Sequence, residues 1–117
     1  MKKNPSLRQK YNIHFHGKAR YGKDWPKIRA RIVRRDGGRC KICEEKKGLH
    51  VHHLIPFKIS HSNEDLNLVT LCRKCHPKVE KVAWMMLQEG AHRYQIYKAA
   101  WGYINNERQK LLLERIQ

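Results

Sequence analysis

The sequence has no long hydrophobic run. Its longest unbroken apolar stretch is Val82 to Leu87, whereas a helix that spans a bilayer needs about 20 apolar residues. The basic start of the chain, MKKNPSLRQK, is followed by no apolar stretch, so we expect no secretory signal. These two absences predict a protein that does not span a membrane and that lies in a reducing cytoplasm, bacterial or phage-infected. In such a compartment, paired cysteines hold metal more often than they form disulfides.

Acidic residues are also scarce. Lys and Arg number 26 against 10 Asp and Glu, a formal net charge of +16. The excess is uneven, because residues 1–39 hold 13 basic and 2 acidic side chains while residues 40–117 hold 13 and 8. A field this strong favours a polyanion, with nucleic acid first and an anionic membrane second. No long apolar face accompanies the basic N-terminal region, which argues against the membrane.

With 117 residues the chain has room for one small domain, whose core alone would leave its stability marginal. Two cysteine pairs, Cys40-x2-Cys43 and Cys72-x2-Cys75, indicate an additional source of stability. Each pair can present two thiolates to one ion, and two pairs complete a tetrahedral four-cysteine zinc site. Four thiolates leave zinc no open position for a substrate, so we predict a structural role for this ion. Redox chemistry is the weaker alternative, because a single CxxC motif suffices for it.

The spacing of apolar residues predicts a small α+β fold. Asp24 is expected to cap the first helix, and Asp36-Gly37-Gly38 is expected to end it. The apolar stripe of the last helix is interpreted as core or as a partner contact. Helices are expected over residues 24–36, 76–89 and 91–115, and strands over residues 49–55 and 66–71.

Between the cysteine pairs lies the stretch HVHHL, residues 50–54. Its adjacent histidines, His52 and His53, can be a packing accident, a metal site or an acid–base pair. VHHLIP, followed by DLNLVTLCRKCH and preceded by WPKIRARIVRRDGGRCKIC, resembles the HNH endonucleases over about residues 25–80. The resemblance implies a zinc-stabilised, treble-clef-like ββα-metal core of two strands and a helix around one divalent ion. An N-terminal helix and C-terminal helices would flank that core.

Position by position, the resemblance implies an active site. His53 matches the general base, and Asn67 matches the residue that orients the base and its loop through hydrogen bonds. His52 and His76 match ligands of the catalytic divalent metal, which is Mg²⁺, Mn²⁺, Ni²⁺ or Zn²⁺. Glu80 stands at the third-ligand position, one helical turn beyond His76.

The residue types agree with these roles on chemical grounds. A neutral imidazole is a suitable base near pH 7, and a divalent ion stabilises charge on a phosphate and on its leaving oxygen. His52 and His53 point to opposite sides of a regular strand, so one ring can hold the ion while the other addresses a water. Asn67 is polar in a predicted strand that is otherwise core, and such a group must be hydrogen-bonded.

A structural role is the alternative for each histidine. For His50 we favour that interpretation, and we expect His61, in the polar loop, to be solvated. His52, His53, Asn67 and His76 fall together at family spacing within one zinc-clamped segment, and coincidence explains this poorly.

We therefore predict a metal-dependent endonuclease that nicks or cuts duplex DNA with weak sequence preference, as in phages or mobile elements. The alternative is a zinc-stabilised nucleic-acid-binding module without catalysis. A third possibility is a subunit activated by a protein partner on the C-terminal helices, where a dimer is also conceivable. The expected divisions are a basic arm over 1–23, the HNH domain over 24–90 and a helical extension of that domain over 91–117. The expected nucleic-acid contacts are Arg31, Arg34, Arg35, Lys58, Arg73 and Lys74.

Overall fold

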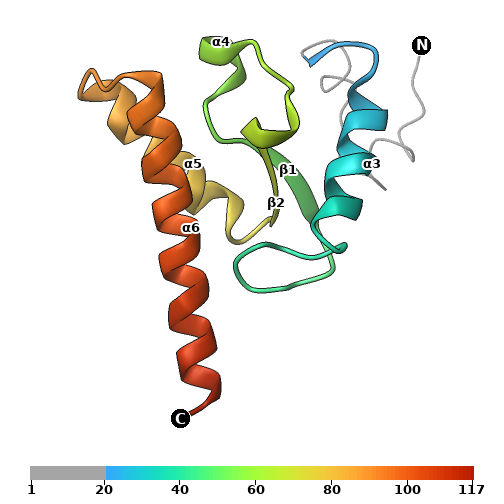
Figure 1. Ribbon diagram of the computed structural model, residues 1–117, viewed down its shortest axis with the longest axis vertical. Coiled ribbons are helices and arrows are strands. Elements are labelled where there is room, and N and C mark those ends of the chain that lie inside the picture. Colours follow the sequence, from blue (N-terminus) through green and yellow to red (C-terminus); the bar gives the residue numbers. More distant parts are fainter. Residues whose placement is uncertain (1–20) are drawn as a thin grey trace.

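The computed structural model describes residues 21–117, so the predicted basic arm lies outside the described residues as far as residue 20. A two-stranded sheet lies between α3 on one side and the pair α5 and α6 on the other (Figure 1). No helix in this part of the chain is long and apolar enough to cross a membrane. The elements are α3 (Trp25–Arg35), β1 (Leu49–His53), α4 (Phe57–Ser60), the 3₁₀ turn η1 (Asp65–Asn67), β2 (Leu68–Cys72), α5 (His76–Gln88) and α6 (Arg93–Arg115).

The two strands pair antiparallel, with His53 opposite Leu68 and His52 opposite Val69. Because side chains alternate along a strand, this register gives the sheet two different faces. Val51 and Leu68 pack with Trp25 and Ile32 on the α3 face. His52 lies on the other face, where its ring meets that of His76 at the start of α5. The adjacent histidines of HVHHL therefore point in opposite directions.

The first helix packs through one apolar face, in which Trp25 and Ile32 are buried. Asp24 precedes the first helical residue, as predicted, but its side chain accepts no capping hydrogen bond. Its φ and ψ of −86° and 0° differ from the extended conformation that aims a cap side chain back at the helix. The backbone carbonyl of Asp24 instead accepts the N–H of Ile28 at 3.0 Å.

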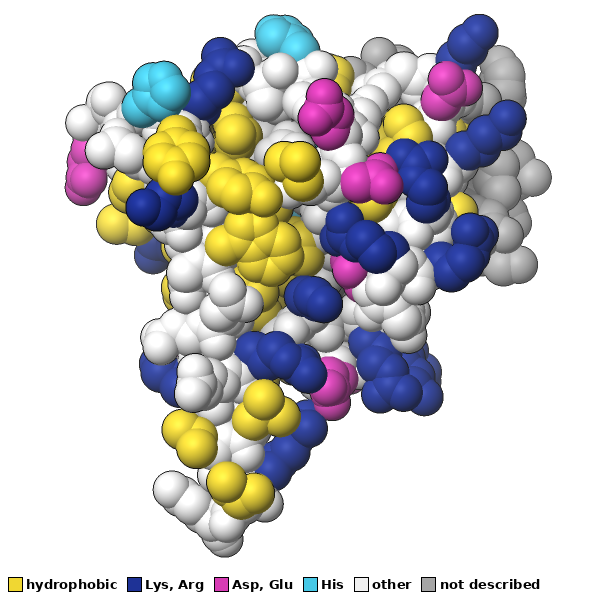
Figure 2. Space-filling view, viewed as in Figure 1, with side chains coloured by type: hydrophobic (Ala, Val, Ile, Leu, Met, Phe, Trp, Pro, Cys, Tyr) yellow, Lys and Arg dark blue, Asp and Glu magenta, His cyan; other side chains and the backbone are white. Residues whose placement is uncertain are grey.

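A second apolar cluster lies between the sheet and the helical pair α5 and α6. Val69 of β2, Val79 of α5, and Ala100 and Ile104 of α6 are completely buried in it. The buried apolar face of α6 ends before Leu112, which is 40% exposed. Hydrophobic side chains remain exposed along α6 (Figure 2), among them Tyr94, Leu112 and Leu113.

The second strand begins two residues later than predicted. Leu66 is 64% exposed and, with Asn67, belongs to the 3₁₀ turn that precedes β2. The polar loop between the two strands also contains the short helix α4. The reason is local hydrogen bonding, because the Asn67 side chain bonds to the backbone of Ile55 and leaves no regular ladder at this end of the sheet.

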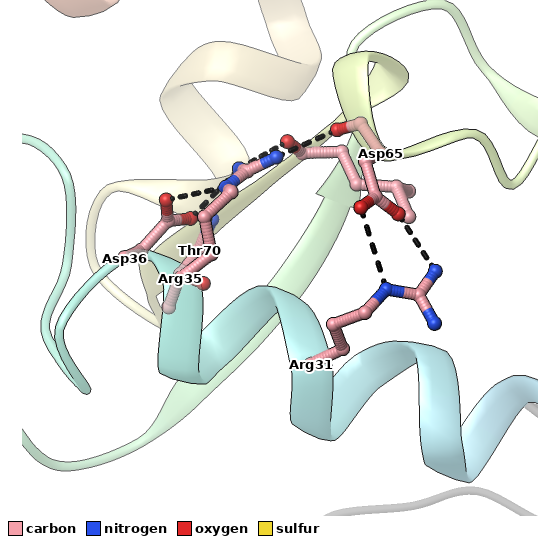
Figure 3. Close-up of polar contacts among 6 residues, drawn as sticks. Arg31, Arg35, Asp36, Asp65 and Thr70 are labelled. Atoms are coloured by element: carbon pink, nitrogen blue, oxygen red, sulfur yellow. Dashed lines mark hydrogen bonds and ion pairs between the residues drawn. The ribbon is translucent and has the colours of Figure 1, made fainter.

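Asp36, the first residue after α3, ties that helix to β2 (Figure 3). Its side chain is 3% exposed and accepts the Thr70 N–H at 2.9 Å and the Arg35 guanidinium at 2.9 Å. Arg35 also donates to the carbonyl oxygens of Leu68 and Asp65, both at 2.7 Å. Burial by itself would raise the pKa of Asp36, but the hydrogen bonds from Arg35 and Thr70 outweigh it and lower that pKa. A carboxylate at a helix C-terminus is unfavourable for the helix dipole, so the role of Asp36 is tertiary.

We expect Asp36→Ala to lower the free energy of unfolding by about 2–4 kcal/mol, because it removes the carboxylate partner of Arg35 and leaves the buried Thr70 N–H without its acceptor. Asp65→Ala is the matched control. It removes only the ion pair with Arg31, whose two side chains are 51% and 50% exposed, and it should cost less than about 1 kcal/mol. Urea unfolding at pH 7 measures both. The difference should shrink as the pH falls through the lowered pKa of Asp36, and equal losses at neutral pH would contradict this account.

Candidate active site and metal centre

The four cysteines come together at one point. Their Sγ atoms all lie within 4.8 Å of one another, and those of Cys43 and Cys72 are 3.6 Å apart. Cys40, Cys72 and Cys75 are buried. Burial raises the pKa of Cys43 and of Cys75, so thiolates at these positions need a cation beside them. The cluster is thus positioned to bind a metal ion, and four sulfur ligands are typical of zinc.

Backbone hydrogen bonds bring the two cysteine turns together. The N–H of Lys41, in the first turn, donates to the Thr70 carbonyl of β2 at 2.9 Å. Cys72 is the last residue of β2, and the N–H of Cys75 returns to its carbonyl at 3.1 Å. The sheet therefore carries one turn at its end and holds the other at its side.

Glu44, just after the first turn, joins this cluster to α6. Its φ of +67° is in the left-handed region, which is costly for a non-glycine residue. Its carboxylate pairs with Arg108 at 3.0 Å and with Arg115 at 3.2 Å. The C-terminal half of α6 is thereby attached to the cysteine turn.

His52, which is buried, and His76, which is partly buried, form a pair on the α5 face of the sheet. Their ring centroids lie 4.9 Å apart, with the ring planes at 78°. Burial, followed by the charges of His76 and His53, lowers the pKa of His52 to about 3. Burial also lowers the pKa of His76, against an opposite effect of Glu80. Both rings are therefore neutral at pH 7, which is the form of imidazole that binds metal.

The Nε2 atom of His52 is buried and has no hydrogen-bond partner within residues 21–117. His52 is 6% exposed, and a buried polar atom without a partner carries a desolvation cost of about 1–3 kcal/mol. Coordination of a cation would remove that cost. The buried Nε2 atom of His52 is therefore suited to be a ligand of a metal ion.

His50 lies beside this pair, with its ring stacked on that of His76 at 5.2 Å and 16°. Sequence reasoning interpreted it as a structural histidine. The signal that places it near the pair is the strand period of two residues, which puts positions 50 and 52 on one face.

Glu80 is less well placed than the histidines. Its carboxylate accepts a long hydrogen bond of 3.5 Å from the indole N–H of Trp84. In the described part of the chain, the four cysteines are the one group of three or more His, Cys, Asp or Glu residues whose ligand atoms gather closely. Glu80 is thus near His52 and His76 but is not gathered with them.

His53 lies on the α3 face of the sheet, within an aromatic cage formed by Tyr21, Trp25 and Phe57. Its ring stacks on Trp25 at 5.2 Å and 18°. Its centroid is 4.5 Å from that of Tyr21 and 5.3 Å from that of Phe57. His53 is 6% exposed, and its Nε2 lies 2.8 Å from Oδ1 of Asn63. The cage holds the ring in a defined plane.

Although His52 and His53 point to opposite faces of the sheet, both reach one cavity of about 210 Å³. This is possible because β1 ends at His53, where the chain turns and the two faces of the sheet meet. Lys58 stands at the same cavity with its Nζ 5.4 Å from the centre of the Trp84 ring. The lining residues are Tyr21, Val51, His52, His53, Pro56, Phe57, Lys58, His76, Glu80 and Trp84.

Asn67 holds the loop that forms the roof of this cavity. The residue is 3% exposed, and its Oδ1 accepts the N–H of Ile55 at 2.9 Å. Its Nδ2 donates to the carbonyls of Ile55 and Ser62 and to Oγ of Ser60, at 3.1–3.3 Å. The side-chain amide of Asn67 therefore holds together both ends of the loop that carries Phe57 and Lys58.

The basic residues expected to bind nucleic acid differ in whether their side chains already have partners within the domain. Arg31 is paired with Asp65 at 2.7 Å, and Arg35 is occupied by Asp36 and two carbonyls. Arg34, Arg73 and Lys74 are exposed. Lys and Arg side chains cover much of the surface seen in Figure 2, over α3 and along the lower part of α6.

Residues 39–81 match the family model of the HNH endonucleases. The matched stretch contains both cysteine pairs, the histidines of the cavity, Asn67 and Glu80. No curated protein and no solved structure matches the chain significantly.

We expect Asn67→Ala to loosen the loop beside the cavity without unfolding the domain. We expect the Ile55 amide to lose protection in hydrogen exchange, because its acceptor is the deleted Oδ1, and the free energy of unfolding to fall by about 1–3 kcal/mol. The neighbouring Leu54 amide donates to the backbone carbonyl of Asn67 at 2.8 Å and should keep its protection. Asn67→Asp retains an acceptor and should fall between the two. Equal exchange of Ile55 in wild type and Asn67→Ala would show that the side chain does not hold the loop.

Proposed function

Because the chain carries an HNH endonuclease domain over residues 39–81, we propose that it is a metal-dependent endonuclease that hydrolyses phosphodiester bonds of duplex DNA. One observation carries the proposal: within the matched segment, His52 and His53, from the two faces of β1, and His76, from the start of α5, reach a single cavity. A divided site of this kind separates a metal-binding position from a proton-accepting one.

On the α5 face, His52 and His76 would hold the catalytic ion. The buried Nε2 of His52 without a partner and the neutral state of both rings support this assignment. Glu80 is the third protein ligand in our proposal, and it would give up its long contact with Trp84 to serve. When bound, a divalent cation stabilises the negative charge that develops on the phosphate and on the leaving 3′ oxygen.

On the α3 face, His53 would act as the general base. The ring accepts a proton from a water molecule, the water oxygen forms the new bond to phosphorus, and the bond to the 3′ oxygen breaks. The aromatic cage holds the ring in one plane, so little freedom is lost when the substrate binds. The Asn67 amide keeps the loop closed over the cavity, and the Lys58 ammonium at the cavity is available to a phosphate oxygen.

The net charge of +16 supports binding to the phosphate backbone. Contacts with phosphates supply affinity but no information about the bases, so we propose weak sequence preference. Arg34, Lys58, Arg73 and Lys74 are the contacts we favour. Arg31 and Arg35 remain in the proposed interface, but each would have to share a guanidinium that already has an acidic or carbonyl partner.

We further propose that the four-cysteine cluster holds a structural zinc ion. A tetrahedral set of thiolates is complete without a substrate or water. Zinc binding at such sites is worth on the order of 10 kcal/mol or more, which is comparable with the entire stability of an ordinary domain. The ion would join the first cysteine turn, the end of β2 and the start of α5.

A nucleic-acid-binding module without catalysis is the second candidate. It is favoured by one observation: in the described chain the cysteine cluster gathers three or more metal-ligating side chains, whereas His52, His76 and Glu80 do not. Such a module would bind DNA through the same charges and would need one metal ion.

Catalysis is tested by incubating supercoiled plasmid with the protein and Mg²⁺, Mn²⁺, Ni²⁺ or Zn²⁺. We expect the wild type to relax or linearise the plasmid and His53→Ala to be slower by about 10²–10⁴, the usual contribution of a general base. DNA binding by the variant should be unchanged. His61→Ala, which removes an exposed histidine of the neighbouring loop, should cleave within about twofold of wild type. Wild type and His53→Ala that are equally inert with every metal would exclude the nuclease.

Metal counting separates the two candidate functions. For the nuclease we expect two bound ions in the wild type and one in His76→Ala, since that variant loses a ligand of the catalytic ion and keeps the four cysteines. A chelator that removes both ions should unfold the domain, whereas His76→Ala should remain folded by circular dichroism. One ion in both proteins would favour the module without catalysis. A metal-free protein that stays folded would contradict the structural role of the cysteines.

A further inference from the structure

The side chain of Asn63 is hydrogen-bonded to the ring of His53. It lies in the loop between α4 and η1, two residues beyond the end of the left-handed turn at His61. Its Oδ1 is 2.8 Å from Nε2 of His53, and its Nδ2 donates to the carbonyl of Tyr21 at 2.7 Å. The side chain therefore bridges the loop, the proposed base and the segment that precedes α3.

We propose that Asn63 is a positioning residue that holds His53 in the Nε2–H tautomer, so that Nδ1 is the nitrogen that accepts a proton from water. This inference rests on the proposed function and adds to it a second residue that orients the base. The sequence resemblance to the HNH endonucleases implies an orienting role for Asn67 and assigns none to Asn63.

The orientation of the Asn63 amide follows from its second partner. A backbone carbonyl can only accept a hydrogen bond, so the group that faces the Tyr21 carbonyl must be the NH₂ of Asn63. The amide oxygen then faces His53, and an amide oxygen can only accept. The His53 nitrogen at 2.8 Å must therefore carry the proton. In the neutral ring the lone pair is left on Nδ1.

The aromatic cage cannot make this choice by itself. Stacking on Trp25 and edge contacts with Phe57 define the plane of the ring. A rotation of the ring by 180° about its Cβ–Cγ bond keeps that plane and exchanges the positions of nitrogen and carbon atoms. The hydrogen bond to Asn63 distinguishes the two orientations, because the rotated ring would present a carbon to the amide oxygen.

Asn67 does not duplicate this function. Its described side-chain hydrogen bonds all go to the loop, to Ile55, Ser60 and Ser62. The task that the family resemblance gives to one asparagine is thus divided in this chain. Asn67 holds the loop, and Asn63 holds the ring.

The test compares Asn63→Leu and Asn63→Asp in the zinc-loaded full-length chain. Leucine has a similar size but no acceptor, and aspartate restores an acceptor oxygen while losing the donor to Tyr21. We expect Asn63→Leu to lower kcat for plasmid cleavage about 10- to 100-fold, the usual effect of losing an orienting partner of a functional histidine, with KM and DNA affinity unchanged. Asn63→Asp should recover a large part of that loss. Ser62→Ala, which removes a loop hydroxyl that bonds to the Glu64 N–H, should leave kcat within about twofold.

Nitrogen-15 spectra of the histidine rings provide a readout that does not depend on activity. We expect the neutral His53 ring in the wild type to carry its proton on Nε2 and to exchange it slowly with solvent. In Asn63→Leu that proton should exchange rapidly, while the spectrum of the remaining domain is unchanged. A wild-type ring protonated on Nδ1, or an Asn63→Leu variant with unchanged exchange and kcat, would overturn the inference. An inactive wild type with the expected ring spectrum would instead reject the nuclease and leave the hydrogen bond established.

Discussion

The antiparallel pairing of β1 with β2 is the constraint on which the candidate site depends. With a side-chain period of two residues, this one register sends His52 toward α5 and His53 toward α3. A slip of one residue would exchange the two faces and place each ring in the surroundings of the other. The register is held by elements outside the sheet: Asp36 binds the Thr70 N–H, and the first cysteine turn binds the Thr70 carbonyl.

Of the polar groups buried around this small sheet, Asp36 and Asn67 are compensated by hydrogen bonds, whereas Oγ1 of Thr70 and Nε2 of His52 have no partner in the described chain. Asp36 is paired with Arg35, and Asn67 uses both ends of its amide within one loop. His52 is different, because burial keeps it neutral and its Nε2 has no partner in the described chain. A domain of this size has little stability to spare, so a persistent cost at one position is best explained by a function at that position.

Sequence reasoning located most of the individual parts. The cysteine spacing predicted the cluster, and apolar periodicity predicted α3, α5 and α6 to within a few residues. It failed at Asn67, which it placed in a strand. Leu66 and Leu68 have the two-residue spacing of a strand, but the side-chain amide of Asn67 bonds to the backbone of Ile55, and the ladder begins only at Leu68. It also missed Asn63, because a loop asparagine has no periodicity or spacing to mark it.

The sequence by itself determined the ligand chemistry: four thiols in two pairs, adjacent imidazoles in one strand, a strong positive charge and an HNH-like order of residues. These are properties of composition and local spacing. Only the tertiary structure decided which imidazole faces which partner, that Asn63 rather than Asn67 bonds to His53, and that Arg35 is committed to β2. These outcomes depend on contacts between residues that are 10 or 33 positions apart in the sequence. Such contacts form only when the loop and α3 pack against the sheet, so no local sequence pattern predicts them.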